Sequence, residues 1–281
     1  MLLAVDIGNS SISVGLFETN TVGGQRPNLC RCFKIATECR RSADEYAMIL
    51  RELLLDFAEC ITDVVLGSVV PALTYTLREA VTRLTKSVDV PVITVGSGVR
   101  TGVGLSVDEP GILGADIVAN AAAAVWLYEA PAVILDFGTV TVLSAVNSSR
   151  SLVGVSIVSG VRTSLESLRN AAAQIQFVSL EEPGPLLGRN TADAARSGII
   201  YGTACMVDGL IDRLPRDIYI PEKTQLLATG GLASMVIPHC RHVFFYEPEL
   251  TLLGLWRIYM LTVEREKKIR KSGTETTLPF I

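Results

Sequence analysis

A short pattern occurs twice in this chain, as LLAVDIGNSSISVGLF at residues 2–17 and as AVILDFGTVTVLSAV at residues 132–146. In each copy an apolar run ends at an aspartate, a glycine follows two positions later, and small polar residues lead into a second apolar run. Two apolar runs joined by a short glycine-containing turn are typical of a β-hairpin, because glycine removes the side-chain obstacle in a tight turn. The repeat therefore predicts a duplicated fold with one such hairpin in each half.

Each turn carries groups that suit a phosphate or a metal ion. The polar and glycine positions correspond pairwise between the two copies: Asp6, Gly8, Asn9 and Ser10 to Asp136, Gly138, Thr139 and Thr141. Backbone N–H groups and hydroxyls in such a turn bind anions, and a carboxylate binds a metal ion. Two turns of this kind predict that the two halves bind a nucleotide triphosphate between them.

The bulk composition is that of a two-domain enzyme and excludes several other classes. The chain has 281 residues, about twice a typical domain length. Although 49% of its residues are hydrophobic, no apolar run reaches the roughly 18 residues of a membrane helix, so no membrane partner is expected. We expect the high apolar content to belong to the cores or to a subunit interface. A net charge of −4 argues against nucleic acid as a partner.

The start of the chain and its cysteines indicate a cytoplasmic protein. The N-terminus begins directly with the strand-like MLLAVDIG and lacks the features of a secretory signal. Six cysteines are scattered along the chain, and a cytoplasmic setting keeps them reduced. Cys30 and Cys32 are not matched by a second pair at metal-ligand spacing, so we expect no zinc site.

The order of the expected elements indicates an α/β fold with mixed sheets flanked by helices. In the first half, a strand meander over 2–36 precedes helices at 42–60 and 73–86 and strands within 61–74 and 88–97. After an Ala-rich helix at 115–130 the pattern restarts, with elements expected at these residues: a strand pair in 132–160, helices at 163–173 and 191–213, strands at 224–231 and 242–248, and a final helix at 250–268. We therefore expect one domain over 1–115 and a second over 116–281.

Seven segments, in order, resemble the type III pantothenate kinases, which belong to the acetate and sugar kinase/actin-like superfamily. The matching segments are DIGNSS, GSVVP, GAD at 114–116, DFGTVT, NTADAARSGIIYG, LLATGGLA and EPELTLLGL. The resemblance implies two ribonuclease-H-like domains with the active cleft between them. It also implies ATP-dependent phosphorylation of pantothenate at its primary hydroxyl, the first step of coenzyme A biosynthesis, by a homodimer.

Phosphoryl transfer requires charge neutralisation and alignment, and these requirements give roles to the turn residues. Asp6 is the expected holder of Mg²⁺, which prefers carboxylate and phosphate oxygens. By resemblance Asp136 holds a monovalent cation, K⁺ or NH₄⁺. The expected ATP- and phosphate-binding residues are Asp6, Ile7, Gly8, Asn9, Ser10, Ser11, Ile12, Ser13, Thr139, Thr141, Gly230 and Gly231.

By resemblance Asp116 is the catalytic base that accepts the proton of the pantothenate hydroxyl. The alternative role for Asp116 is purely structural, because an aspartate in the first turn of a helix stabilises the helix dipole. The resemblance implies that Thr191 contacts pantothenate. Threonine is also a common helix cap, and the two roles are compatible. The expected substrate-binding residues are Val107, Gly114, Ala115, Asp116, Ile117 and Thr191.

Two substitutions near the acceptor depart from the family pattern. Ile117 stands where the family has an arginine, and Val107 where it has a tyrosine. Loss of a charged hydrogen bond costs about 1.5 to 3 kcal/mol. Three functions therefore remain open: an active pantothenate kinase, which the retained carboxylates favour, a catalytically impaired relative that acts as a nucleotide-binding regulator, and a kinase for a different small alcohol. Arg162 is a candidate replacement for the missing arginine.

Overall fold

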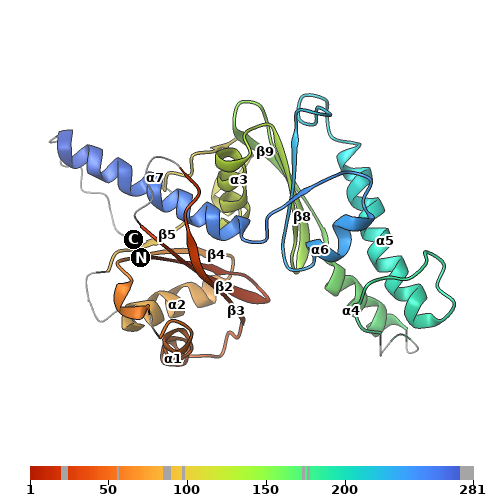
Figure 1. The fold of residues 1–281 in the computed structure, drawn as a ribbon, viewed down its shortest axis with the longest axis horizontal. Helices are drawn as coiled ribbons and strands as arrows, with labels where there is room; N and C mark the ends of the chain where they lie inside the picture. Colours follow the sequence, from red (N-terminus) through yellow and green to blue (C-terminus); the bar gives the residue numbers. More distant parts are fainter. Residues whose placement is uncertain are drawn as a thin grey trace. The chain divides into compact units, whose positions relative to one another are not determined.

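A computed structural model describes residues 1–19, 25–55, 57–84, 90–96, 99–172, 175 and 178–272 (Figure 1). The chain forms two compact units, and neither is a continuous stretch of sequence. Unit 1 comprises Met1–Gly102, Gly111–Trp126 and Thr251–Ile281, and unit 2 comprises Val103–Pro110 and Leu127–Leu250. This division groups residues by packing, whereas the boundary expected at residue 115 separates the two sequence repeats and stays a prediction.

Unit 1 is built on a mixed sheet that, within the described residues, has five strands in the order β3-β2-β1-β4-β5. Strands β1, β2 and β3 form an antiparallel meander, and β4 and β5 continue the sheet in parallel with β1. The bounds are β1 Leu2–Ile7, β2 Ser11–Phe17, β3 Leu29–Ala36, β4 Asp63–Ser68 and β5 Val92–Thr94. The meander and the first expected hairpin are thereby confirmed.

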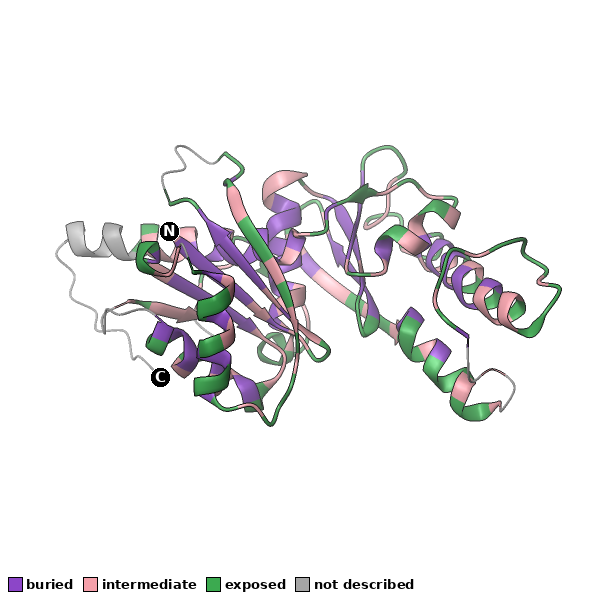
Figure 2. Cartoon of the chain, turned by 60° about the horizontal axis from the view of Figure 1, so that its bottom comes forward, coloured by how far each residue is buried: buried purple, intermediate pink, exposed green. Residues whose placement is uncertain are grey.

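Helices α1 (Ala43–Leu53) and α2 (Pro71–Leu84) cover one face of this sheet. Helix α1 begins at Ser42, whose side chain accepts the N–H of Glu45 while the Glu45 carboxylate accepts the N–H of Ser42. The apolar faces of both helices share one core with the inward-facing residues of β1, β2 and β4. Figure 2 shows this pattern as buried strands beneath helices whose outer faces are exposed.

The opposite face of the sheet is covered by α3 (Ala115–Leu127) and α7 (Leu250–Ser272), two helices far apart in sequence. Their backbones approach so closely that a Cβ at Gly254 would overlap the Ala119 carbonyl. The rings of Trp126 and Trp256 stack with centroids 5.2 Å apart, and Thr251 Oγ1 donates a 2.8 Å hydrogen bond to Asn120 Oδ1. Helix α7 therefore completes the unit to which β1 belongs.

Unit 2 repeats the strand order of unit 1. Within the described residues its sheet has the order β11-β10-β7-β8-β9-β6, in which β7, β8 and β9 form the antiparallel meander and β10 and β11 run parallel to β7. The bounds are β6 Gly104–Leu105, β7 Ala132–Phe137, β8 Val140–Val146, β9 Ser151–Ser159, β10 Gln225–Thr229 and β11 Phe245–Tyr246. This confirms the expected duplication of a mixed sheet.

Three helices pack against the core of unit 2: α4 (Val161–Ala171), α5 (Thr191–Ile211) and α6 (Ala233–Val236). Short 3₁₀ helices lie at Ala58–Cys60, Pro110–Ile112 and Ile237–His239. In the part of the chain that the structure describes, none of the helices combines the length and the apolarity that crossing a membrane requires.

Three expected elements were wrong in detail. The strand expected at 242–248 covers only Phe245–Tyr246. The helix expected over 42–60 ends at Leu53, because the chain turns at Leu54 and brings Phe57 and Ala58 back against the core. The strand pair expected in 132–160 is three strands, since the polar turn at 147–150 reverses the chain a second time. Parts of the loop at 19–28 and of the strand at 88–97 lie outside the described residues.

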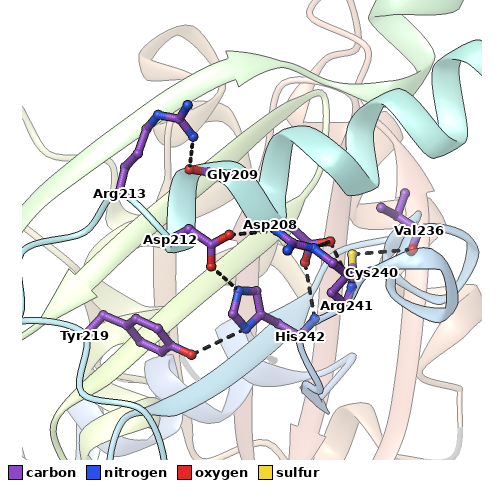
Figure 3. Close-up of polar contacts among 9 residues, drawn as sticks. All are labelled: Asp208, Gly209, Asp212, Arg213, Tyr219, Val236, Cys240, Arg241 and His242. Atoms are coloured by element: carbon purple, nitrogen blue, oxygen red, sulfur yellow. Dashed lines mark hydrogen bonds and ion pairs between the residues drawn. The ribbon is translucent and has the colours of Figure 1, made fainter.

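A polar cluster in unit 2 fixes the segment between α6 and β11 to the C-terminal turn of α5 (Figure 3). The Asp208 side chain is buried and accepts the backbone N–H groups of Arg241 at 2.8 Å and His242 at 3.2 Å. Asp212 contacts His242 Nε2 at 2.9 Å and the Arg241 guanidinium at 2.7 Å, and these two partners hold the pKa of Asp212 below its usual value. The buried charge of Asp208 is thus compensated by donors on a single short segment.

The contact at Gly254 makes a testable prediction about stability. We expect Gly254→Ala to lower the free energy of unfolding by about 3 kcal/mol or more, since the new methyl group meets the rigid backbone of α3. The control is Gly202→Ala in α5, where the added Cβ has no described atom within 4 Å and the gain in helix propensity is up to about 1 kcal/mol. Urea denaturation measures both, and equal stability of the two variants would contradict the prediction.

Candidate active site

The first turn, between β1 and β2, is tight and is braced from β3. The Gly8 N–H donates to the Ser11 carbonyl at 3.0 Å, and a Cβ at Gly8 would lie 2.9 Å from the same oxygen. Thr37 follows β3 and holds the turn at two points: its hydroxyl donates to the Gly8 carbonyl at 2.6 Å, and its N–H donates to the Ser10 carbonyl at 3.2 Å. Sequence analysis missed Thr37, because its place directly after the third strand of the meander does not show that it contacts the first turn.

Strand alternation divides the predicted residues 6–13 between the two faces of the sheet. Ile7 and Ile12 are fully buried in the core beneath α1 and α2, so they offer only backbone groups to a ligand. Asp6 lies opposite Ser13 on β2 and beside Gly67 on β4, and its side chain belongs to the other face. Asn9 and Ser10 are exposed at the tip of the turn, and Ser11 is partly exposed.

Helix α3 begins on the same face of the sheet as Asp6. A Cβ at Gly67, the strand neighbour of Asp6, would lie 3.6 Å from the Ala115 side chain, so the first residue of α3 lies over Gly67. Asp116 is the next residue. The structure therefore brings the predicted base and the predicted Mg²⁺ holder to one face of unit 1, although they are far apart in sequence.

The Asp116 carboxylate is oriented by the backbone around it. Its Oδ1 accepts the N–H of Ile117 at 2.7 Å, which is the structural role expected of an aspartate at the start of a helix. The carboxylate folds back over Gly114, where a Cβ would overlap Oδ1 and displace the carboxylate from this orientation. Burial raises the pKa of Asp116 above its ordinary value, and the hydrogen bond from Ile117 opposes this shift. A carboxyl group with a raised pKa is a better proton acceptor once ionised.

The second turn, between β7 and β8, places Asp136 against two glycine-containing segments. Asp136 is the penultimate residue of β7 and lies beside Thr229 of β10. A Cβ at Gly230, whose φ is +94°, would lie 2.6 Å from Asp136 Oδ1, and a Cβ at Gly138 would lie 3.6 Å from the same oxygen. Only glycine combines this backbone conformation with this approach at position 230. The exposed Gly231 follows directly in the chain.

The second turn is one residue shorter than the first, and this changes the position of Thr141. Four residues separate the paired Ile7 and Ile12, whereas three separate the paired Phe137 and Thr141. Thr141 therefore corresponds to the buried Ile12. The sequence comparison had matched it with Ser10, and that match was wrong. The Thr141 side chain is 1% exposed, and its hydroxyl has no hydrogen-bond partner among the described residues. Its role as a phosphate ligand stays a prediction.

The remaining predicted residues are distributed between the units. Ile117 lies in the first turn of α3 in unit 1, whereas Val107, partly exposed in the bend after β6, belongs to unit 2. Thr191 is the exposed first residue of α5 and is not its cap: the neighbouring Asn190 caps the helix, with Oδ1 accepting the Asp193 N–H at 2.9 Å. The Thr191 hydroxyl is therefore not needed for capping.

A family model for type III pantothenate kinases matches residues 2–213 of the chain. The chain belongs to this family. Its activity is that of a pantothenate kinase, in coenzyme A biosynthesis. Two curated family members illustrate the similarity. The type III pantothenate kinase of Saccharopolyspora erythraea is 40% identical over 261 residues, covering 92% of this chain and 98% of its own. That of Streptomyces griseus is 36% identical over 273 residues, covering 94% and 100%.

Solved structures agree with the fold. A putative 2-dehydro-3-deoxygalactonokinase from Sinorhizobium meliloti matches with a TM-score of 0.58, 12% identity and coverage of 100% of both chains. An activator of 2-hydroxyisocaproyl-CoA dehydratase from Clostridium difficile, solved with bound ADPNP, matches with a TM-score of 0.55, 12% identity and coverage of 99% of both chains. At these identities the matches establish the duplicated actin-like architecture and nothing about the substrate.

The raised pKa of Asp116 predicts a pH-dependent effect of Asp116→Asn on stability. The folded protein favours the neutral carboxyl, so ionisation above the ordinary pKa of about 3.9 destabilises the fold. Asparagine retains the acceptor for the Ile117 N–H without the charge. We expect the variant and the wild type to be equally stable below pH 4. At neutral pH we expect the variant to be more stable, and this difference in stability appears as the pH rises through the pKa of folded Asp116. Thermal melts across this range measure it, and a variant less stable at neutral pH would contradict it.

The buried hydroxyl of Thr141 makes a second prediction. Thr141→Val removes a polar group that lacks a partner in the described structure, and we expect it to raise the free energy of unfolding by about 1 kcal/mol. Thr203→Val is the matched control, because Thr203 is also buried but its hydroxyl donates to the Ile199 carbonyl at 2.7 Å, so its loss lowers stability. Urea denaturation without ligand distinguishes the two. A loss of stability in both variants would show that the Thr141 hydroxyl has a stabilising contact.

Proposed function

We propose that this chain transfers the γ-phosphoryl group of ATP to the primary hydroxyl of pantothenate, with Asp116 as the general base. The observation that carries this proposal is the placement of Asp116 on the face of unit 1 that bears Asp6, in a member of the type III pantothenate kinase family. A carboxylate oriented by the Ile117 N–H and partly buried suits proton transfer from an alcohol.

The two turns supply the nucleotide-binding groups in this proposal. The backbones at Gly8 and Gly138 run in tight turns, and the neighbouring Asn9 and Thr139 are exposed. Such turns present N–H groups to phosphate oxygens. We assign both turns to the phosphates of ATP and the exposed Gly231, beside Gly230, to the adenosine end.

The residues present fit the ions that the family reaction requires. Asp6, the penultimate residue of β1, would provide the single carboxylate that Mg²⁺ needs when phosphate oxygens and waters complete its shell. Bound with ATP, Mg²⁺ neutralises the charge that develops on the phosphate oxygens. For the monovalent cation, K⁺ or NH₄⁺, we assign Asp136, whose Oδ1 faces the backbone of the turns at Gly138 and Gly230.

Protein groups then carry the acceptor half of the reaction. The ionised Asp116 accepts the hydroxyl proton as the new bond from oxygen to phosphorus forms. Thr191, exposed and not needed as a cap, is free to contact pantothenate. Ile117 provides no charged donor at the position where the family has arginine, and we therefore expect weaker binding of pantothenate than in relatives that have it. From the family resemblance we also infer a cytoplasmic homodimer.

A turnover assay tests the proposal. ADP release from Mg·ATP is measured in K⁺ buffer with and without pantothenate, for the wild type and for Asp116→Asn. We expect pantothenate to stimulate release, and the variant to lose about 10²-fold or more of the stimulated rate while still binding ATP.

Three other results would change the assignment of the function or of the base. A folded wild type that binds ATP without any stimulation by pantothenate would favour the regulator, which Ile117 and Val107 motivate. Stimulation by a less polar alcohol instead of pantothenate would identify a kinase for a different acceptor. An unimpaired Asp116→Asn enzyme would remove Asp116 as the base.

A further inference from the structure

Arg162 is the basic residue that stands at the phosphate-loop end of the sheet in unit 2. Strands β7, β8, β9 and β10 bring three segments to this edge, residues 136–141, 159–164 and 229–236. Arg162 is the only lysine or arginine in these segments. The phosphoryl group transferred from ATP spreads negative charge over its equatorial oxygens, and positive side chains stabilise this charge.

The backbone on both sides of Arg162 is held against the second turn. A Cβ at Gly160 would overlap the Thr139 carbonyl and lie 2.7 Å from the Gly138 carbonyl. On the other side, Thr163 Oγ1 donates to the Thr139 carbonyl at 2.7 Å. Arg162 therefore extends from a short segment that is fixed to the turn proposed to bind phosphate.

The start of α4 adds a favourable field at the same place. Its cap residue Gly160 provides no side-chain hydrogen bond, and the Ser164 N–H, bonded to the Gly160 carbonyl at 2.8 Å, makes the first helical bond. The N–H groups that precede Ser164 point out of the helix start, where the helix dipole favours an anion. On the neighbouring strand β8, the Thr141 hydroxyl is buried without a described partner, on the same face as residues that pack with Val161 of α4.

The Arg162 side chain has no structural task in the described chain. It is exposed and makes no hydrogen bond or ion pair with a described residue. By contrast, Arg196 pairs with Asp193 and Glu181, and Arg241 pairs with Asp208 and Asp212. The Arg162 guanidinium is thus available for a ligand.

We propose that the Arg162 guanidinium binds the phosphoryl group during its transfer, an inference that rests on the proposed function. In this step the pantothenate hydroxyl oxygen bonds to the γ-phosphorus, the bond from that phosphorus to the β–γ bridging oxygen breaks, and ADP leaves with the electron pair. The hydroxyl proton passes to Asp116. Arg162 stays charged throughout and donates hydrogen bonds to the equatorial oxygens of the phosphoryl group.

The test compares Arg162→Ala and Arg162→Lys with a control, Arg216→Ala, at an exposed arginine without a described partner. Steady-state kinetics give kcat and both KM values, and calorimetry gives the affinity for ADP with aluminium fluoride, a mimic of the transferring phosphoryl group. For Arg162→Ala we expect kcat to fall about 10²-fold. We also expect the affinity for ADP with aluminium fluoride to fall, while the affinity for ADP alone changes little. Lysine should restore part of both, since it retains the charge without the planar fork. The control should match the wild type.

Three results would overturn the proposal. The first is an Arg162→Ala enzyme with wild-type kcat and wild-type affinity for the mimic. The second is a rise in the pantothenate KM alone, which would assign Arg162 to the acceptor carboxylate. The third is an equal loss in the Arg216→Ala control. If the wild type does not phosphorylate pantothenate, the proposed function fails by itself, and the binding of ADP with aluminium fluoride still decides whether Arg162 contacts a phosphoryl group.

Discussion

The close approach of α3 and α7 to each other and to the first sheet determines where the predicted catalytic base lies. Glycines make the approach possible: Gly254 admits the backbone of α3, and Gly67 admits the side chains of Ala115 and Leu255. With bulkier residues at these positions, α3 would stand away from the sheet and Asp116 would lose its place on the Asp6 face. Shape complementarity at small residues, rather than an ion pair, thus brings the two carboxylates to one surface.

Much of this architecture could be predicted from the sequence because the signals are local. An apolar run, an aspartate and a glycine turn define a hairpin within one segment, and the two copies predicted a hairpin in each half. The full three-strand meander was predicted only for the first half. Helix α5 was placed within two residues of its observed end for the same reason, since its capping and periodic residues are contiguous. The family assignment also rested on short motifs in a fixed order.

What could not be predicted depends on contacts between distant segments or on the register of single residues. The braces from Thr37 and Thr163 need the third strand of each meander to be placed against the turn that it follows. No periodic pattern in the sequence indicates that α7 packs against unit 1. The shorter second turn places Thr141 within β8, at the buried position that Ile12 occupies in β2, and not in the turn, where Ser10 lies.

The path of the chain has a consequence for its synthesis. The polypeptide leaves unit 1 after Trp126, builds almost all of unit 2, and returns at Thr251. During translation the face of the first sheet that α3 covers therefore lacks α7 until the segment that follows unit 2 has left the ribosome. Until then, the surface that later receives Leu252 and Leu255 is an exposed apolar face on a nascent protein. The order of synthesis thus separates the first strands of unit 1 from the helix that completes it by nearly the whole of unit 2.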